Sequence, residues 1–141
     1  MRIFIVGIWM MLFTALPIEA QSQVQDSIFP DRSAMQKYIW ETVRDRKFSD
    51  LVLRLGGRDE YTTEQLAGVQ NQFGQIYPQP FKEAKQVVDK RLENGFRKEI
   101  VSFWRGTSYL WLYLFTHEVD GKLVVINFRM NSRPNPVFDL M

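Results

Sequence analysis

Two apolar runs joined by Asp120-Gly121 constrain the fold of this chain more than any other feature. Residues 109–119 and 122–130 are rich in aromatic and β-branched side chains. An Asp-Gly pair tolerates the positive φ angles of a two-residue hairpin turn, so the pattern predicts an antiparallel hairpin in which Val119 lies opposite Lys122. Every further pair then follows by counting outward, because the turn sets the register of a hairpin.

This counting predicts two different faces of the hairpin. The first is apolar throughout and pairs His117 with Val124, Phe115 with Ile126, Tyr113 with Phe128, and Trp111 with Met130. The second is mixed and pairs Glu118 with Leu123, Thr116 with Val125, Leu114 with Asn127, and Leu112 with Arg129. We expect helices to cover the apolar face.

Three helices are predicted before the hairpin, each from apolar residues at three- and four-residue spacing. Asp31 or Ser33 can cap the first helix, and Gly56-Gly57 can stop the second. A capping box formed by Thr62 and Gln65 starts the third. Their expected buried faces are Met35, Tyr38, Ile39, Thr42 and Val43; Phe48, Leu51, Val52 and Leu55; and Leu66, Val69, Phe73, Ile76 and Tyr77.

The segment 81–92 fits either a helix or a polar-rich strand. Its place between the third helix and a turn at Asn94-Gly95 favours a strand. After that turn, alternating side chains predict a further strand. If Arg105-Gly106 is a tight turn, this strand brings Ile100 beside Trp111.

These elements predict an α+β domain in which N-terminal helices pack on a curved antiparallel sheet of about four strands. The order of the elements, together with Phe103–Gly106, Trp111–Phe115 and Asp120–Phe128, resembles small secreted bacterial proteins of the nuclear-transport-factor-2-like (cystatin-like) superfamily. The resemblance implies a cone-like fold whose interior is a ligand pocket, an active site or only core. It also implies a bacterial, periplasmic protein, but no reaction, since the same fold serves enzymes, binding modules and assembly domains.

The start of the chain has the pattern of a cleavable signal peptide. Arg2 is followed by an apolar run from Ile3 to Leu16, a break at Pro17 and a small residue, Ala20. A retained membrane anchor and a buried helix are the alternatives. We expect a signal peptide over 1–20, a flexible leader over 21–30, a single domain over 31–133 and a C-terminal tail over 134–141, in a periplasmic or secreted protein without a stable membrane anchor.

Composition excludes several classes of function. The chain has no cysteine, which rules out disulfides, thiolate chemistry and a lipid-modified N-terminus. Its formal net charge is only +2, and its basic stretch is interleaved with acidic residues, so we expect no nucleic-acid partner. His117 is the single histidine and cannot complete a common zinc site without cysteines, so we expect neither a metal nor a cofactor.

An aromatic pocket is the first candidate site. If the cone is open, its polar aromatic side chains and the histidine would line a pocket for a flat, hydrophobic ligand; these are Tyr38, Tyr109, Trp111, Tyr113 and His117. If the cone is filled, they are core residues. His117 is either a rim residue with a structural role or a general base, with Tyr113 or Tyr109 orienting a small hydrophobic substrate. We assign no catalytic residue.

An apolar stripe on the mixed face is the second candidate site. This leucine stripe comprises Val101, Leu110, Leu112 and Leu114, and Arg129 borders it. Contiguous exposed apolar surface usually marks an interaction site. Either a second copy of the chain pairs with the stripe in a homodimer, or the tail folds over it.

The sequence therefore favours an exported binding or structural module without catalysis, acting through a sheet face or a modest aromatic pocket. The alternatives are an acid–base enzyme that acts on a small hydrophobic substrate inside the cone, and an assembly domain within a periplasmic complex.

Overall fold

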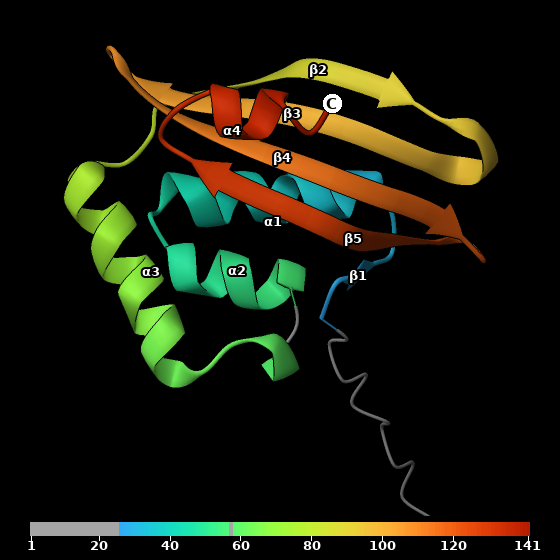
Figure 1. Cartoon of the computed structure of the whole chain (residues 1–141), viewed down its shortest axis with the longest axis horizontal. Coiled ribbons are helices and arrows are strands. Elements are labelled where there is room, and N and C mark those ends of the chain that lie inside the picture. Colours follow the sequence, from blue (N-terminus) through green and yellow to red (C-terminus); the bar gives the residue numbers. More distant parts are fainter. Residues whose placement is uncertain (1–25, 57) are drawn as a thin grey trace, which may run out of the picture.

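A five-stranded antiparallel sheet separates two helical layers of unequal size (Figure 1). The computed structural model describes residues 26–56 and 58–141; the predicted signal peptide, and the predicted leader up to residue 25, lie outside the described residues. Three helices cover one face of the sheet, here called the inner face, and a short C-terminal helix lies on the outer face. The predicted α+β class is confirmed, with five strands rather than about four.

The elements follow one another with short connections. The strands are β1 (Ile28–Phe29), β2 (Glu83–Arg91), β3 (Phe96–Arg105), β4 (Ser108–Val119) and β5 (Lys122–Asn131), and their order in the sheet is β1-β5-β4-β3-β2. The helices are α1 (Arg32–Arg44), α2 (Phe48–Gly56), α3 (Thr63–Ile76) and α4 (Asn135–Phe138), with 3-10 turns at Arg58–Glu60 and Glu93–Gly95. Within the described residues, no helix is long and apolar enough to cross a membrane.

The fifth strand, β1, comes from the segment that was predicted to be a loose leader. Ile28 and Phe29 pair with β5, and the amide of Val125 donates a hydrogen bond to the carbonyl of Ser27 at 2.7 Å. Phe29 is only 3% exposed. The prediction of a flexible segment up to residue 30 is therefore wrong at its end, because burial of a single phenylalanine side chain and pairing to an open strand edge together order these residues.

The three predicted helices are confirmed, as are the N-terminal caps of α1 and α3; the predicted stop of α2 includes Gly57, which lies outside the described residues. The side chain of Asp31 accepts a hydrogen bond from the amide of Ala34 at the start of α1, and Thr62 and Gln65 form the capping box of α3. The residues expected to be buried on α2 are all buried. By contrast, every described residue of α3 is exposed or half-buried, because this helix packs at the margin of the core, where Phe73 lies 5.5 Å from the ring of Phe48.

The hairpin turn is confirmed, but the register changes partway along the strands. Asp120 and Gly121 have φ angles of 51° and 70°. Pairing follows the prediction from the turn as far as Thr116, which lies opposite Val125. A β-bulge follows, since Phe115 pairs with Asn127 and leaves Ile126 without a partner on β4. The predicted pairs beyond this point are wrong; the observed pairs are Leu114–Phe128, Tyr113–Arg129, Leu112–Met130 and Trp111–Asn131.

The bulge reverses the assignment of the two faces. One extra residue shifts every later side chain of β5 to the opposite face, since side chains alternate along a strand. Phe128 and Met130 thus join the leucines of β4, and Asn127 and Arg129 leave them. The face predicted to be mixed becomes mainly apolar and is the one that the large helices cover, whereas the aromatic face lies on the other side of the sheet.

The strand preceding the hairpin is confirmed, and the segment 81–92 contains a strand, β2. Asn94 and Gly95 take positive φ angles of 57° and 81° in the connection between β2 and β3. The next turn lies one residue later than expected, because Arg105 still pairs with Ser108. Ile100 consequently lies opposite Tyr113 rather than Trp111, on the same face.

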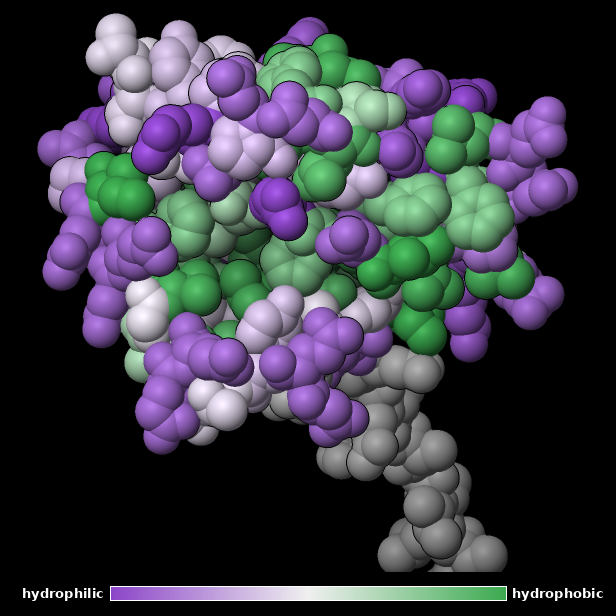
Figure 2. All heavy atoms as spheres, viewed as in Figure 1, coloured by the Kyte–Doolittle hydropathy of each residue, from purple (hydrophilic) through white to green (hydrophobic). Residues whose placement is uncertain are grey.

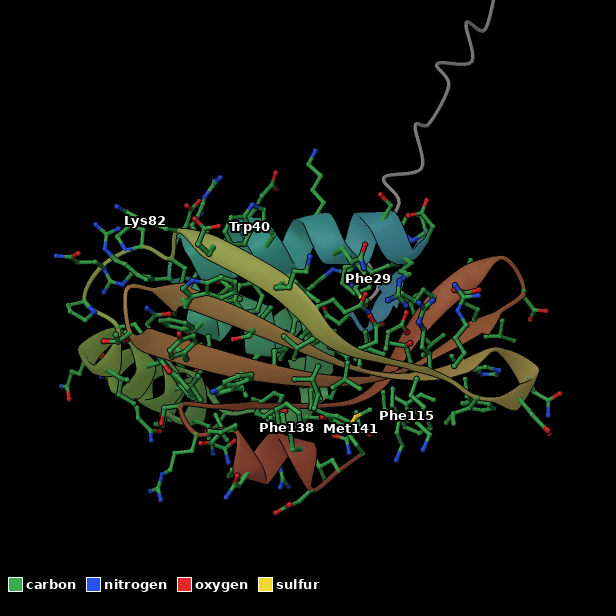
Figure 3. All side chains as sticks on the ribbon, turned by 90° about the horizontal axis from the view of Figure 1, so that it is seen from above. Phe29, Trp40, Lys82, Phe115, Phe138 and Met141 are labelled. Atoms are coloured by element: carbon green, nitrogen blue, oxygen red, sulfur yellow. The ribbon has the colours of Figure 1, made fainter. Side chains whose placement is uncertain are left out.

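The tail folds back over the outer face, where α4 shields the middle of the sheet. Val137 is fully buried against Ile100 and Tyr113, and the ammonium group of Lys98 donates a hydrogen bond to the carbonyl of Leu140 at 2.9 Å. Figure 3 shows Phe138 on this side of the sheet and Trp40, on α1, on the other. The tail therefore covers the aromatic face and not the leucine stripe.

Candidate functional site

A groove between α1 and the edge strand β2 is the candidate site, because its lining combines apolar side chains with a buried carboxylate. Its volume is about 180 Å³. It exists because the helices cover the middle of the inner face more fully than its edge, and all nine residues of β2 remain exposed or half-buried. The lining residues are Gln36, Ile39 and Trp40 from α1; Ala84, Lys85 and Gln86 from β2; Glu99, Val101 and Phe103 from β3; and Leu114 from β4.

The walls of the groove are mostly apolar and flat. The indole of Trp40 stacks on the ring of Phe103 with 6.0 Å between the ring centroids and 11° between the planes. Phe103 and Leu114 are each 1% exposed, so the floor of the groove is part of the main core. Ligand sites in proteins commonly combine such apolar walls with a few polar groups.

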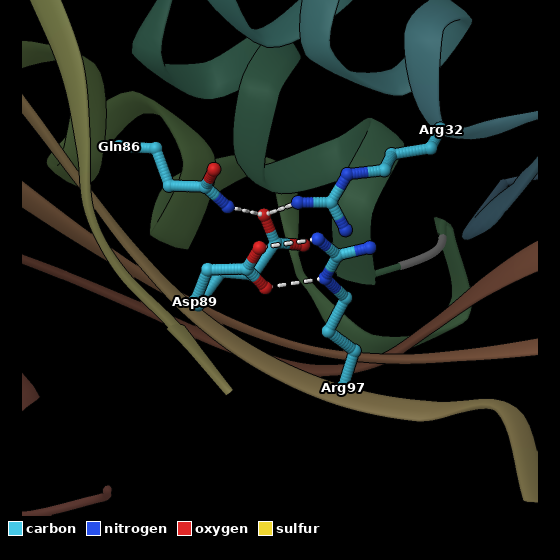
Figure 4. A network of polar contacts seen from close by, with 5 residues as sticks. Arg32, Gln86, Asp89 and Arg97 are labelled. Atoms are coloured by element: carbon cyan, nitrogen blue, oxygen red, sulfur yellow. Dashed lines mark hydrogen bonds and ion pairs between the residues drawn. The ribbon is translucent and has the colours of Figure 1, made fainter. Parts of the chain in front are cut away.

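A buried carboxylate, Glu99, supplies the polar end of the groove. Glu99 is only 1% exposed, although it lies in the middle of β3. Arg32, the first residue of α1, donates a hydrogen bond from Nη2 to Oε1, and the amide of Gln86 donates to the same oxygen (Figure 4). Burial raises the pKa of Glu99, and the charges of Arg32 and Arg97 act in the opposite direction.

A second ion pair lies beside the first, because Asp89 on β2 pairs in register with Glu99 on β3. Arg97 donates from Nε and Nη2 to the two carboxylate oxygens of Asp89 (Figure 4). These hydrogen bonds lower the pKa of Asp89. With both acids ionised, the two carboxylates and the two guanidinium groups sum to zero charge.

The cluster retains unused hydrogen-bonding capacity. Among the described residues, Oε2 of Glu99 and Nη1 of Arg32 are buried and have no hydrogen-bond partner. A buried polar group without a partner costs free energy, and native proteins contain few of them. The carboxylate oxygen is an acceptor, and Glu99 lines the groove, so this end of the groove can accept a hydrogen bond.

The five residues predicted to line a pocket do not converge. Tyr38 lies on the helical side, where its hydroxyl donates a hydrogen bond to the carbonyl of Asp50 at 3.2 Å. Trp111, Tyr113 and His117 share the outer face of β4 with Tyr109. The prediction that they meet on the helix-covered face is wrong, because it depended on a regular register through the hairpin.

On the outer face, Tyr109 stacks on Trp111 with 6.0 Å between the ring centroids, and Trp111 packs against the cluster that contains Tyr113, whereas His117 lies nearer the other end of the strand. Tyr113 is 4% exposed beneath α4, whereas Tyr109 is 42% exposed. His117 stacks on Phe96 with 3.9 Å between the ring centroids, and its Nε2 lies 3.0 Å from the carbonyl oxygen of Asn94. In Figure 2, apolar side chains gather over the part of the sheet nearest the β4–β5 turn, where Ile126 is 48% exposed.

The leucine stripe is core and not surface. Leu110, Leu112 and Leu114 are at most 1% exposed and pack with the helices, while half-buried Val101 lines the groove. Arg129 lies opposite Tyr113 and so belongs to the outer face. The stripe therefore lacks the exposed surface that the predicted homodimer requires, and the prediction of an exposed stripe is wrong.

Local sequence patterns did not predict the polar end of the groove. Glu99 shares one face of its strand with Arg97, Val101 and Phe103, and a single carboxylate in line with Val101 and Phe103 was the available signal. Its arginine partner is 67 residues away in the chain, and no local pattern joins them. Within the described residues, no group of three or more histidine, cysteine, aspartate or glutamate side chains could hold a metal ion.

Comparison of the chain with protein-family models, with characterised proteins and with solved structures finds no match. The site is therefore interpreted from its own geometry.

Proposed function

We propose that this protein is a small binding module that holds a compact, largely apolar molecule in the groove between α1 and β2. The observation that carries the proposal is the position of Glu99, a buried carboxylate at one end of a groove with apolar walls. A buried ion pair is often no more stabilising than well-packed apolar residues in its place, so stability alone gives little reason for one here. Ligand recognition does, because a few polar groups in an apolar site orient the bound molecule.

We further propose that the chain is exported after removal of residues 1–20 and acts in the periplasm or outside the cell. The charged start, the apolar run and the small residue at position 20 support this proposal. The order of helices and strands supports a distant relationship with the nuclear-transport-factor-2-like superfamily. In such a fold the groove would occupy the space between the helices and the sheet.

Binding of toluene to the full chain tests the proposed groove. Toluene is close in size to the groove and has no polar group, and we expect a Kd near 1 mM, observable by saturation-transfer NMR. Ala84→Phe should abolish the signal, because Ala84 lines the groove and a phenyl ring would fill it. Val87→Phe is the matched control, since Val87 is 45% exposed on the same strand outside the groove and should leave binding unchanged. Toluene binding that Ala84→Phe does not weaken overturns the proposal, as does failure of the unaltered chain to bind toluene or any other one-ring compound.

Proton transfer is a second candidate function, favoured by the raised pKa of Glu99. A carboxylate whose pKa lies closer to neutrality is a better general base than an ordinary one. In this candidate, Glu99 takes the role that the sequence analysis considered for His117. The test is deuterium exchange at the carbon next to the carbonyl of 4-methylcyclohexanone in D2O. Exchange that Glu99→Gln abolishes and Asp89→Asn retains supports it, and exchange at the buffer rate excludes it.

A further inference from the structure

We infer that the ligand of the groove is a neutral, one-ring molecule with a hydroxyl group that binds at Glu99. This inference rests on the proposed binding function and narrows it to one class of ligand, the small phenols and ring alcohols. Three properties of the groove carry it: its size, its charge balance and its unused hydrogen-bonding groups.

The size of the groove limits the ligand to about one ring. Its volume is about 180 Å³. An apolar protein cavity of ~150 Å³ accommodates benzene. The stacked rings of Trp40 and Phe103 provide a flat wall against which a six-membered ring can lie.

The charge balance of the groove favours a neutral ligand. The buried Glu99 is paired with Arg32, and the partly exposed Asp89 is paired with Arg97, so the charges at this end of the groove already balance. A carboxylate ligand would place a second negative charge beside Glu99. An ammonium ligand would compete with Arg32 and would face Lys85 at the rim. Either ion would also lose its hydration on entering an apolar groove.

The unused hydrogen-bonding groups favour a hydroxyl. Arg32 and Gln86 both donate to Oε1 of Glu99, which leaves Oε2 as an acceptor without a partner among the described residues. Glu99 lines the groove, whereas Arg32 does not, so the carboxylate is the group that a ligand meets there. A hydroxyl group can donate to the carboxylate, whereas an ether or a ketone can only accept.

The experiment compares four ring compounds that differ in one substituent: p-cresol, toluene, 4-methylbenzoate and 4-methylbenzylammonium. Each is titrated into the full chain at pH 7 and followed by NMR. We expect p-cresol to bind at least tenfold more tightly than toluene, because a hydrogen bond to a charged group contributes more than one to a neutral group. Both ions should bind more weakly than p-cresol.

Two variants assign the preference to Glu99. Glu99→Gln removes the charge with little change in shape and should reduce the advantage of p-cresol over toluene several-fold. Glu83→Gln makes the same change of charge at an exposed residue of β2 that neither lines the groove nor belongs to the two ion pairs, and it should leave the advantage intact. The thermal unfolding of each variant is measured in parallel to show that it is folded.

The outcomes separate this inference from the proposed function. Equal binding of toluene and p-cresol overturns the inference and leaves the binding module standing. Tightest binding of either ion also overturns it, as does a p-cresol preference that survives in Glu99→Gln. Failure of all four compounds to bind overturns the inference and the proposed function together.

Discussion

Arg32 and Glu99 form an ion pair that joins the first residue of α1 to the middle of β3. Their side chains are 18% and 1% exposed, so the pair is screened from solvent mainly on the carboxylate side. Arg32 is therefore the main compensation for a buried negative charge, assisted by the amide of Gln86. The pair fixes the start of α1 over the sheet at the polar end of the groove.

Removal of Arg32 should be strongly destabilising. Arg32→Met leaves the carboxylate of Glu99 buried without its cation, and we expect the free energy of unfolding to fall by about 3 kcal/mol in urea titrations. Arg44→Met is the control, because Arg44 and its partner Asp45 are both about half exposed and a solvent-exposed pair contributes little to stability. A loss below about 1 kcal/mol for Arg32→Met would contradict the predicted role of this pair.

Glu99 should make the stability of the protein depend on pH in a specific direction. Burial raises its pKa above the ordinary value of 4.5, so the folded chain retains a proton at pH values where the unfolded chain has released it. The contribution of Glu99 to the free energy of unfolding therefore increases as the pH falls through the raised pKa toward 4.5. Relative to Glu99→Gln, the unaltered protein should gain stability between pH 7 and pH 5, measured by urea unfolding at each pH.

Asp89→Asn provides the control for this pH effect. Arg97 lowers the pKa of Asp89 below its ordinary value of 3.8, so the stability from that pair is lost only below pH 3.8. The Asp89–Arg97 pair itself should thus add no pH dependence between pH 7 and pH 5. Because the charge of Asp89 also raises the pKa of Glu99, Asp89→Asn should only weaken the pH dependence that Glu99→Gln removes. If the Glu99→Gln difference is constant over this range, the carboxylate of Glu99 is not perturbed by burial.

The C-terminal helix should contribute measurably to the core. Val137 is fully buried, and Val137→Ala should lower the free energy of unfolding by about 2 kcal/mol through lost burial and the cavity left behind. Phe138→Ala removes a larger side chain, but this residue is 40% exposed and contacts Trp111 edge-on, so about 1 kcal/mol is expected. The reverse order of the two losses in urea titrations would show that α4 is not packed as described.

The bulge predicts which residue of the hairpin can be removed. Deletion of Ile126 makes the Thr116–Val125 and Phe115–Asn127 pairs direct neighbours in a regular ladder without moving either pair. We therefore expect the free energy of unfolding to fall by less than about 1.5 kcal/mol. Deletion of Leu114 removes a buried side chain and shifts β4 against both neighbours, and it should cost more than about 4 kcal/mol. Circular dichroism and urea unfolding measure both. An unfolded Ile126 deletion would contradict the observed register.

Local patterns predicted the elements well. The caps at Asp31 and Thr62 satisfy backbone groups within a few residues, and the Asp120-Gly121 turn depends only on local φ angles. The pairs next to that turn were correct for the same reason. The groove was not predictable in this way, because Arg32 and Glu99 come together only when the helices pack on the sheet.

The sequence by itself determined the class of the fold, the helices with their caps and the position of the hairpin turn, since these follow from periodicity and local backbone geometry. Only the tertiary structure decided which face of the sheet became core, because one bulged residue at Ile126 exchanges the faces of β5 and no local energy distinguishes that choice. The burial of Glu99 was decided in the same way. Arg32, on α1, offsets the cost of burying the charge of Glu99, and only the packing of the helices on the sheet brings the two side chains together.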